Sequence, residues 1–255
     1  MSDSAGLELR LATTPGDLAA AARLRYEVFV RELGGDGPLV DHEAGQERDG
    51  FDAFCDHMIV VDPTRPEGRH VIGLYRLLTA EGARAAGQFY SESEYDLAPL
   101  FRSGQRLLEL GRSCLHPAYR GGGAMFRLWQ GLGQYVSERG IELLFGTASF
   151  HGTDPDAIAG PLTLLHQQYL APEPVRPRSK AFVEMDRQME VDRKAAMIAM
   201  PALIKGYLRL GGHVGEGAFI DRAFNTTDIC LILQTDKLTD RARGLYGSGS
   251  GAGRA

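Results

Sequence analysis

Hydrophobic positions in the first part of the chain follow two periods, and these periods separate strands from helices. Apolar and polar residues alternate from Leu7 to Thr13, which predicts a strand. From Gly16 to Leu33 the apolar positions have helical spacing, and Thr14-Pro15 supplies a helix start signal. Two apolar runs, His57 to Val61 and His70 to Leu78, are joined by a turn-forming segment and predict a hairpin.

The middle of the chain repeats the order of strand and helix. The run from Arg106 to Leu115 predicts a strand, and Gly122 to Arg139 has helical spacing. Ile141 to Phe150 predicts a second buried strand. A helix is predicted from Asp154-Pro155 to Tyr169, because Asp154 is placed to cap it and Pro155 suits its first position.

The remaining segments complete an α+β pattern built on one mixed sheet. Gly34 to Phe54 is rich in glycine and carboxylates and predicts a long loop, a class that is often functional. The other predicted elements are short helices in Phe89–Leu100, a short strand in Ala181–Met185, an amphipathic helix over Ala195–Leu210 broken near Pro201, and strands at Ala218–Asp221 and Asp228–Gln234.

Composition limits the function classes. The chain has 255 residues, enough for a sizeable core, and a net charge of −5, which argues against a nucleic-acid partner. Three widely spaced cysteines predict reduced thiols and a cytoplasmic protein. Neither a signal peptide nor a membrane-spanning segment is apparent in the sequence. We expect disorder in residues 1–6 and in the Gly/Ser-rich residues 241–255, with a single domain over 7–240.

The stretch from Leu107 to Gln130 carries the strongest chemical signal. Its predicted strand places Glu109 and Arg112 among leucines, and a glycine run, Gly121 to Gly123, precedes the next helix. Bare backbone amides at a helix start are suited to bind an anionic group.

The order of elements and this glycine run resemble the GNAT acyltransferase family. That family binds the pantetheine pyrophosphate with a loop that reads roughly Gln/Arg-x-x-Gly-x-Gly/Ala. The segment here is Arg120-Gly121-Gly122-Gly123-Ala124-Met125, which keeps the Arg and the fourth-place Gly but has Met125 at the last position. The resemblance implies a mixed central sheet flanked by helices and a phosphate site at Arg120, Gly121, Gly122, Gly123 and Ala124.

Four longer motifs resemble a narrower family, the bacterial ornithine N-acyltransferases. They are GRSCLHPAYR (Gly111–Arg120), LFGTASFHGTDP (Leu144–Pro155), LIKGYLRLGGHV (Leu203–Val214) and FNTTDICLIL (Phe224–Leu233). The resemblance implies transfer of a 3-hydroxyacyl chain from acyl carrier protein to ornithine, giving lyso-ornithine lipid. It also implies a family-specific segment over about 190–240, no permanently bound cofactor, and the acyl-phosphopantetheine of the carrier as co-substrate.

A second likeness is to acyl-homoserine-lactone synthases, and it suggests further site residues. Arg25, Phe29, Asp49, Asp52, Arg76, Phe89, Glu109 and Arg112 fall in the order of that family's motif residues. Both families give acyl chains to an amino-acid-like amine. We therefore assign Arg25, Phe29, Asp49, Asp52 and Arg76 to substrate binding, with Arg25 for the carboxylate of ornithine and the two aspartates for its side-chain ammonium. The alternatives are solvated loop acids and, for Phe29, ordinary core packing.

Three residues are assigned to the chemistry. Glu109 is the predicted base that deprotonates the amine, and its alternative role is a structural ion pair with Arg112 or Arg76. Arg112 requires a bulge to share a site with Glu109, and amides freed at the bulge would hold the thioester oxygen. Ser149 is the predicted proton donor to the thiolate, or else a turn serine. Cys114 is interpreted as a core residue, and no cluster has metal-ligand spacing.

Other functions remain compatible with the same motifs. One is an N-acyl amino acid synthase or an acyl-homoserine-lactone synthase, the latter requiring S-adenosylmethionine. Another is a non-catalytic protein that binds lipid or acyl carrier protein. The lipid product and the amphipathic helix over Ala195–Leu210 suggest a peripheral contact with the inner membrane, although core packing is the alternative for that helix.

Overall fold

The computed structural model describes residues 6–237, which divide into two compact units. The first unit comprises residues 6–87 and 110–140, and the second comprises 88–109 and 141–237. The strand that carries Glu109 and Arg112 therefore contributes to both units. The predicted single domain over residues 7–240 stays a prediction, and the Gly/Ser-rich tail lies outside the described residues.

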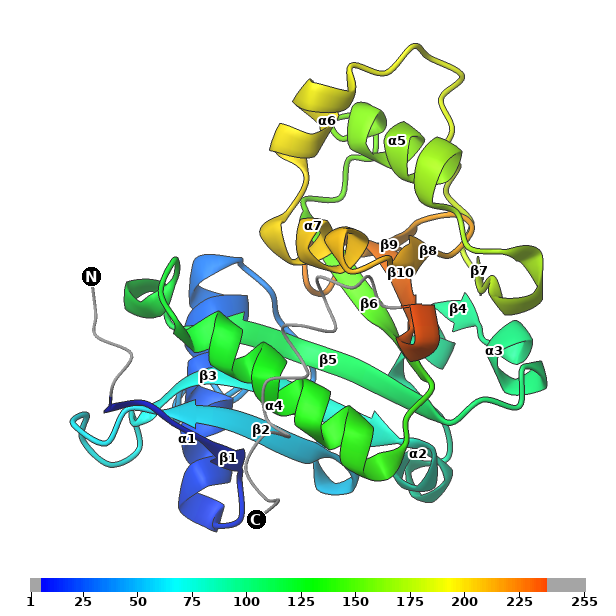
Figure 1. The fold of residues 1–255 in the computed structure, drawn as a ribbon. Helices are drawn as coiled ribbons and strands as arrows, with labels where there is room; N and C mark the ends of the chain where they lie inside the picture. The colour runs from blue at the N-terminus through cyan, green and yellow to red at the C-terminus, as the bar shows by residue number, and fades with distance from the viewer. Residues whose placement is uncertain (1–5, 238–255) are drawn as a thin grey trace. The chain divides into compact units, whose positions relative to one another are not determined.

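The first unit is a sheet with a helix on each face (Figure 1). Its strand order is β1-β2-β3-β5, with β2 antiparallel to both β1 and β3. The elements are β1 (Glu8–Leu11), α1 (Pro15–Arg25), β2 (Asp56–Val61), β3 (Val71–Thr79), α2 (Ala80–Ala86), the second half of β5 (Leu107–Leu115) and α4 (Ala124–Arg139).

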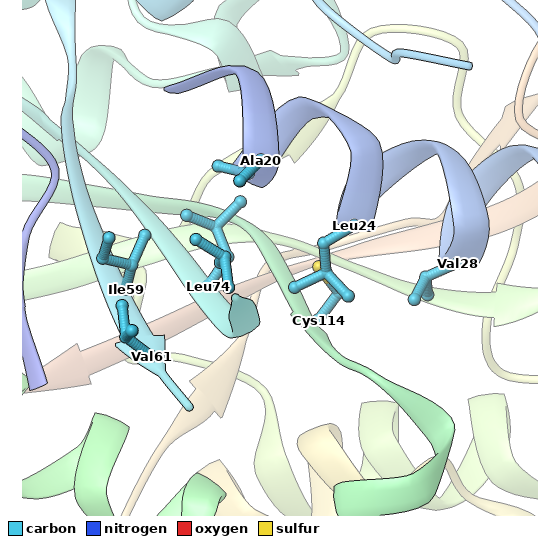
Figure 2. Packing of buried hydrophobic residues seen from close by; sticks show 9 residues of the cluster. Ala20, Leu24, Val28, Ile59, Val61, Leu74 and Cys114 are labelled. Carbon is cyan, nitrogen blue, oxygen red and sulfur yellow. The ribbon is translucent and has the colours of Figure 1, made fainter. Parts of the chain in front are cut away.

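Alternation along β2 explains how both faces of this sheet are covered, because successive side chains of a strand point to opposite faces. Ile59 belongs to a core cluster that it shares with Ala20 and Leu24 of α1 (Figure 2). Its neighbour Met58 lies beside Gly131 of α4, where an added Cβ would come within 3.0 Å of the Met58 sulfur. The glycine thus lets α4 pack closely on the face opposite α1.

The second unit is organised around a parallel strand pair. The first half of β5 pairs with β6 (Leu143–His151) from Leu107 opposite Leu143 to Glu109 opposite Phe145. Strand β10 (Thr226–Gln234) lies antiparallel to β6. The other elements are β4 (Tyr95–Asp96), α3 (Ala98–Arg102), α5 (Ala159–Tyr169), β7 (Arg178–Ser179), α6 (Arg193–Ala199), α7 (Ala202–Arg209), β8 (His213–Val214) and β9 (Phe219–Asp221).

Most predicted elements are confirmed, including the hairpin and the strand–helix–strand order around β5, α4 and β6. The predicted helix from Gly16 to Leu33 has the right extent but changes its hydrogen bonding. After α1, residues Tyr26–Glu32 form a π-helix in which the Leu33 amide donates to the Val28 carbonyl, five residues earlier. π-helical turns are rare in proteins, and those that occur are often found at functional sites.

Two other predictions need correction. The strand predicted over Ala181–Met185 is reduced to a single bridge between Val183 and Ala218. The helix predicted to begin at Asp154-Pro155 begins instead at Ala159, because the Asp154 side chain accepts from the Asp156 amide and closes a local turn. Helix α2 was not predicted, although Thr79 caps it through the Gly82 amide. A further prediction, the break near Pro201, is confirmed by the separate helices α6 and α7.

The helix predicted over Ala195–Leu210 puts most of its apolar side chains into the core. Met200, Ile204 and Leu208 are buried, whereas Ile198 is 71% exposed. Over residues 6–237, no helix has both the length and the apolar character needed to cross a membrane.

Candidate active site

Six charged side chains of the first unit form a closed set of ion pairs, which we call the charge ring. It contains three arginines and three carboxylates: Arg25, Arg76, Arg112, Glu47, Asp49 and Asp52. Its formal charges therefore cancel. The side chains of Arg25 and Glu47 are each only 1% exposed, so one side of the ring is buried in the protein.

Helix α1 meets the carboxylate-rich loop, residues 34–54, at Arg25, the last residue of α1. Its Nε donates to Glu47, and its Nη1 donates to Asp52 over 2.6 Å. The Glu47 amide also donates to the Ala22 carbonyl of α1, which fixes the loop against the helix. The apolar face of α1 thus buries its arginine beside two loop carboxylates.

Strands β3 and β5 supply the other two arginines. Arg76 Nη1 donates to both Asp49 and Asp52, the latter over 2.9 Å. Arg112 Nη2 donates to Asp49 over 2.9 Å, and its Nε donates to Glu47 over 3.4 Å. Each carboxylate of the ring is therefore shared by two arginines.

The arginines of the ring lower the pKa of both aspartates. Burial alone would raise the pKa of Asp49, but the charges of Arg76 and Arg112 outweigh it and lower that pKa to about 2. Burial would likewise raise the pKa of Asp52, and the charge of Arg25 contributes most to lowering it instead. Both aspartates are ionised at neutral pH, so the ring is intact there.

The ring brings together four of the residues that the sequence assigned to substrate binding: Arg25, Asp49, Asp52 and Arg76. Arg112, assigned to the chemistry, joins them. Sequence reasoning missed Glu47, because nothing in the loop separated it from the acids at positions 36, 41 and 43, which stay exposed. The one available signal is its position two residues before Asp49.

Glu109 accepts hydrogen bonds from the turn that precedes β4 in the second unit. Its Oε1 accepts from the amide and hydroxyl of Ser91, the amide over 2.7 Å, and its Oε2 accepts from the Tyr90 amide over 2.8 Å. The side chain is buried, and three donors stabilise the ionised carboxylate. Glu109 therefore anchors this turn, a role that the sequence did not suggest.

Strand β5 departs from regular extended geometry at Arg112. Its φ of +49° lies in the left-handed region, which is uncommon for residues other than glycine. Such a conformation costs roughly 1–3 kcal/mol and tends to cluster at functional sites. That Arg112 shares a site with Glu109 through a bulge stays a prediction.

The glycine segment forms an uncapped helix start. Gly121 has a φ of +77°, and Gly123 precedes α4 with no side chain capping the first turn. Arg120 donates from Nε to the Leu115 carbonyl, and its two Nη atoms form 2.6 and 2.7 Å bonds to the Glu32 carboxylate. This bidentate pair lowers the pKa of Glu32. The arginine predicted to bind phosphate is therefore already paired with a carboxylate.

The other assigned residues are placed less distinctively. Ser149 is exposed on β6, opposite Asp228 of β10. Phe29 is half-buried against the core cluster shown in part in Figure 2. Cys114 belongs to that cluster, and burial raises the pKa of its thiol to about 12, which confirms its interpretation as a core residue.

One acidic cluster was not found from sequence spacing. In the second unit, Glu94, Asp221 and Asp228 each bring a carboxylate oxygen within 4.8 Å of the other two. The three residues are far apart in the chain, so no short motif identifies them. Glu94 and Asp228 are buried and Asp221 is half-buried.

Comparisons with known proteins agree with this architecture. Residues 24–130 match a family model described as an acetyltransferase (GNAT) domain. Among solved structures, FeeM, an N-acyl amino acid synthase from uncultured soil microbes, has a TM-score of 0.53 at 14% identity and covers 93% of this chain and 97% of its own. The acyl-homoserine-lactone synthase LasI has a TM-score of 0.50 at 14% identity, with 98% of each chain covered. These likenesses show the fold.

Sequence comparison gives a narrower placement. The L-ornithine N(alpha)-acyltransferase of Rhodobacter capsulatus is 54% identical over 243 residues, covering 94% of each chain. The chain is therefore an acyltransferase with a GNAT fold and belongs to the family of bacterial L-ornithine N(alpha)-acyltransferases.

Proposed function

We propose that this enzyme transfers a 3-hydroxyacyl chain from the thioester of acyl carrier protein to the α-amine of ornithine, forming lyso-ornithine lipid. The observation that supports the acceptor most strongly is the 54% identity to a named L-ornithine N(alpha)-acyltransferase over 94% of both chains. The charge ring adds support, because it gathers fixed positive and negative side chains in the first unit, as an acceptor that carries both charges requires.

The reaction requires one proton to be removed before the amine can attack. The free α-amine attacks the thioester carbonyl, the C–N bond forms, the C–S bond breaks, and the thiolate leaves and is protonated. In this proposal Glu109 accepts the proton of the α-ammonium, directly or through a water molecule, a step worth about 10²–10⁴-fold in rate. Ser149 supplies the proton to the thiolate and recovers one from the attacking nitrogen, which loses its second proton as the amide forms.

The three donors around Glu109 bear on its role as a base. The amides of Tyr90 and Ser91 and the Ser91 hydroxyl hold the carboxylate through three hydrogen bonds. They also fix the orientation of the carboxylate. Ser91 is accordingly a positioning residue for Glu109.

The thioester oxygen needs donors as negative charge develops on it. Backbone amides beside Arg112, where β5 leaves its regular geometry, are the donors in this proposal. They would hold the oxyanion that forms when the amine attacks, and because the amine itself is the nucleophile no acyl-enzyme is formed. The buried, weakly acidic thiol of Cys114 fits a direct transfer.

The donor arm is bound at the start of α4. The amides of Gly121 to Ala124 and the Arg120 guanidinium bind the phosphate of the phosphopantetheine, aided by the dipole of α4. Glu32 must leave Arg120 for this to happen. The pair is partly exposed, at 43% for Arg120 and 37% for Glu32, and such pairs contribute only ~0–1 kcal/mol. Its displacement is therefore easy.

The carrier protein and the membrane complete the proposal. Acyl carrier protein is acidic, so Arg120 and Arg127 near the phosphate site are suited to contact it. The product has one acyl chain and a charged head, so the enzyme would act at the inner face of the membrane as a peripheral protein. Liposome flotation with and without product lipid measures that association.

An assay with purified enzyme tests the function. We expect acyl-ornithine, detected by mass spectrometry, from 3-hydroxyacyl-carrier protein and ornithine, with little product from acyl-CoA. Glu109→Gln should lower kcat about 10²-fold or more while acyl-carrier binding survives. Formation of a lactone only with S-adenosylmethionine, or acylation of another amine in preference, would reject ornithine as the acceptor. Carrier binding without turnover on any amine would indicate a non-catalytic protein.

A further inference from the structure

Helix α1, the loop before β2 and His57 of β2 line an open pocket of about 330 Å³ in the first unit. The wall on α1 is formed by Pro15, Leu18, Ala19 and Ala22, which recur at helical spacing, together with Ala21. The facing residues are Arg48, Asp52, Ala53 and His57, and Arg25 belongs to the lining as well. A volume of this size lies at the lower end for small-molecule sites.

The pocket and the charge ring share two residues, Arg25 and Asp52. Arg25 uses Nε and Nη1 within the ring, and within the described part of the chain its buried Nη2 has no hydrogen-bond acceptor. Arg25 as a whole is only 1% exposed. A buried guanidinium nitrogen without an acceptor is costly, and an anionic ligand would satisfy it.

His57 supplies the complementary group. Its Nε2 lies 3.1 Å from the Asp52 carbonyl, which can only accept, so Nε2 carries the proton. Burial lowers the pKa of His57, and the ring is neutral with Nδ1 as an acceptor. Nδ1 is buried, and no donor among residues 6–237 reaches it. Arg25 and His57 therefore offer one unused donor and one unused acceptor beside an aliphatic wall.

We propose that this pocket receives the acceptor amino acid, with its carboxylate on Arg25 and its aliphatic side chain along Leu18, Ala19 and Ala22. The side-chain ammonium then lies against Asp52 and His57 Nδ1. A short α,ω-diamino acid fits this arrangement, because it has an anionic end, a few methylenes and a cationic end. This inference rests on the proposed function and adds the residues that select the acceptor.

Filling the pocket tests the inference. Ala19 is half-buried on α1, so Ala19→Phe would place a large side chain in the pocket without disturbing the core. We expect KM for ornithine to rise about tenfold or more, with KM for the acyl donor unchanged, as expected for loss of acceptor binding alone. Ala85→Phe, at an exposed position of α2 outside the pocket, is the matched control and should leave both constants unchanged.

Direct binding separates this inference from the proposed function. Calorimetric titration of the full-length enzyme with ornithine should give binding that Ala19→Phe weakens and Ala85→Phe preserves. An unchanged KM and affinity in Ala19→Phe would overturn the pocket assignment even if ornithine is the acceptor. If the wild-type enzyme acylates another amine, the proposed function fails. Ala19→Phe and Ala85→Phe are then compared with that amine as the acceptor. A higher KM for the amine in Ala19→Phe alone supports the pocket assignment, and an unchanged KM rejects it.

Discussion

Removing the Glu47 carboxylate should destabilise the first unit more than any exposed substitution. Glu47→Gln keeps the shape of the side chain but changes the formal charge of the ring from zero to +1. Both Glu47 and Arg25 are 1% exposed, so the charge left behind is shielded from water. Removing one partner of a buried ion pair typically costs about 3–5 kcal/mol.

The ring itself sets the expected value within that range. After the substitution Arg25 keeps its 2.6 Å pair with Asp52, and Arg112 keeps its 2.9 Å pair with Asp49. Neither arginine is left alone, so we expect a loss of about 3 kcal/mol, at the lower end for buried pairs. With a urea m-value of roughly 3 kcal/mol/M, the unfolding midpoint would fall by about 1 M.

Tryptophan fluorescence provides the assay, since Trp129 is the one tryptophan in the sequence and lies in α4 of the first unit. Glu43→Gln, an exposed acid of the same loop, is the control and should change stability by less than about 0.5 kcal/mol. The double variant Glu47→Gln/Arg112→Gln restores a neutral ring and should be less unstable than the sum of the two single variants. A loss below about 1 kcal/mol for Glu47→Gln would refute a charge-balanced buried ring.

Three further outcomes follow from the structure. Glu32→Gln should tighten binding of an acyl-phosphopantetheine donor by up to about fivefold, because it frees Arg120. A higher KM for the donor in this variant would contradict the expectation. The folded-state pKa of Asp49, about 2, lies below the unfolded value of ~3.9, so its stabilisation is full at neutral pH. It should decline below pH ~4 and vanish near pH 2, and thermal melts of Asp49→Asn should lack this part of the acid loss. Among the thiols, half-buried Cys55 should react with Ellman's reagent at pH 8 in the native enzyme while buried Cys114 and Cys230 do not; rapid reaction of all three would contradict the buried assignments.

Local patterns predicted the framework well because strands and helices leave periodic signals. The hairpin, the β5–α4–β6 order and the break at Pro201 all follow from spacing, glycine and proline. The start of α5 did not, since Asp154-Pro155 has the composition of a helix cap but closes a turn instead. The π-helix after α1 was also invisible, because apolar spacing does not report which carbonyl each amide bonds.

The sequence predicted which residues form the site better than it predicted the ion pairs and hydrogen bonds among them. Arg25, Asp49, Asp52 and Arg76 were identified by resemblance, but that they belong to one closed ring with Glu47 and Arg112 depends on contacts between residues far apart in the chain. Glu47 has no periodic signal in its loop. The contacts of Glu109 with the turn at Tyr90 and Ser91 span about twenty residues, and no local pattern encodes them.

Transfer to isotopically labelled ornithine tests the proposed reaction most directly. Ornithine with ¹⁵N at the α-amine is incubated with the enzyme and 3-hydroxyacyl-carrier protein, and the product is fragmented in the mass spectrometer. We expect a single amide that contains the ¹⁵N atom and a free side-chain amine. Absence of acyl-ornithine, or an amide at the unlabelled nitrogen, would contradict α-amine transfer by this enzyme.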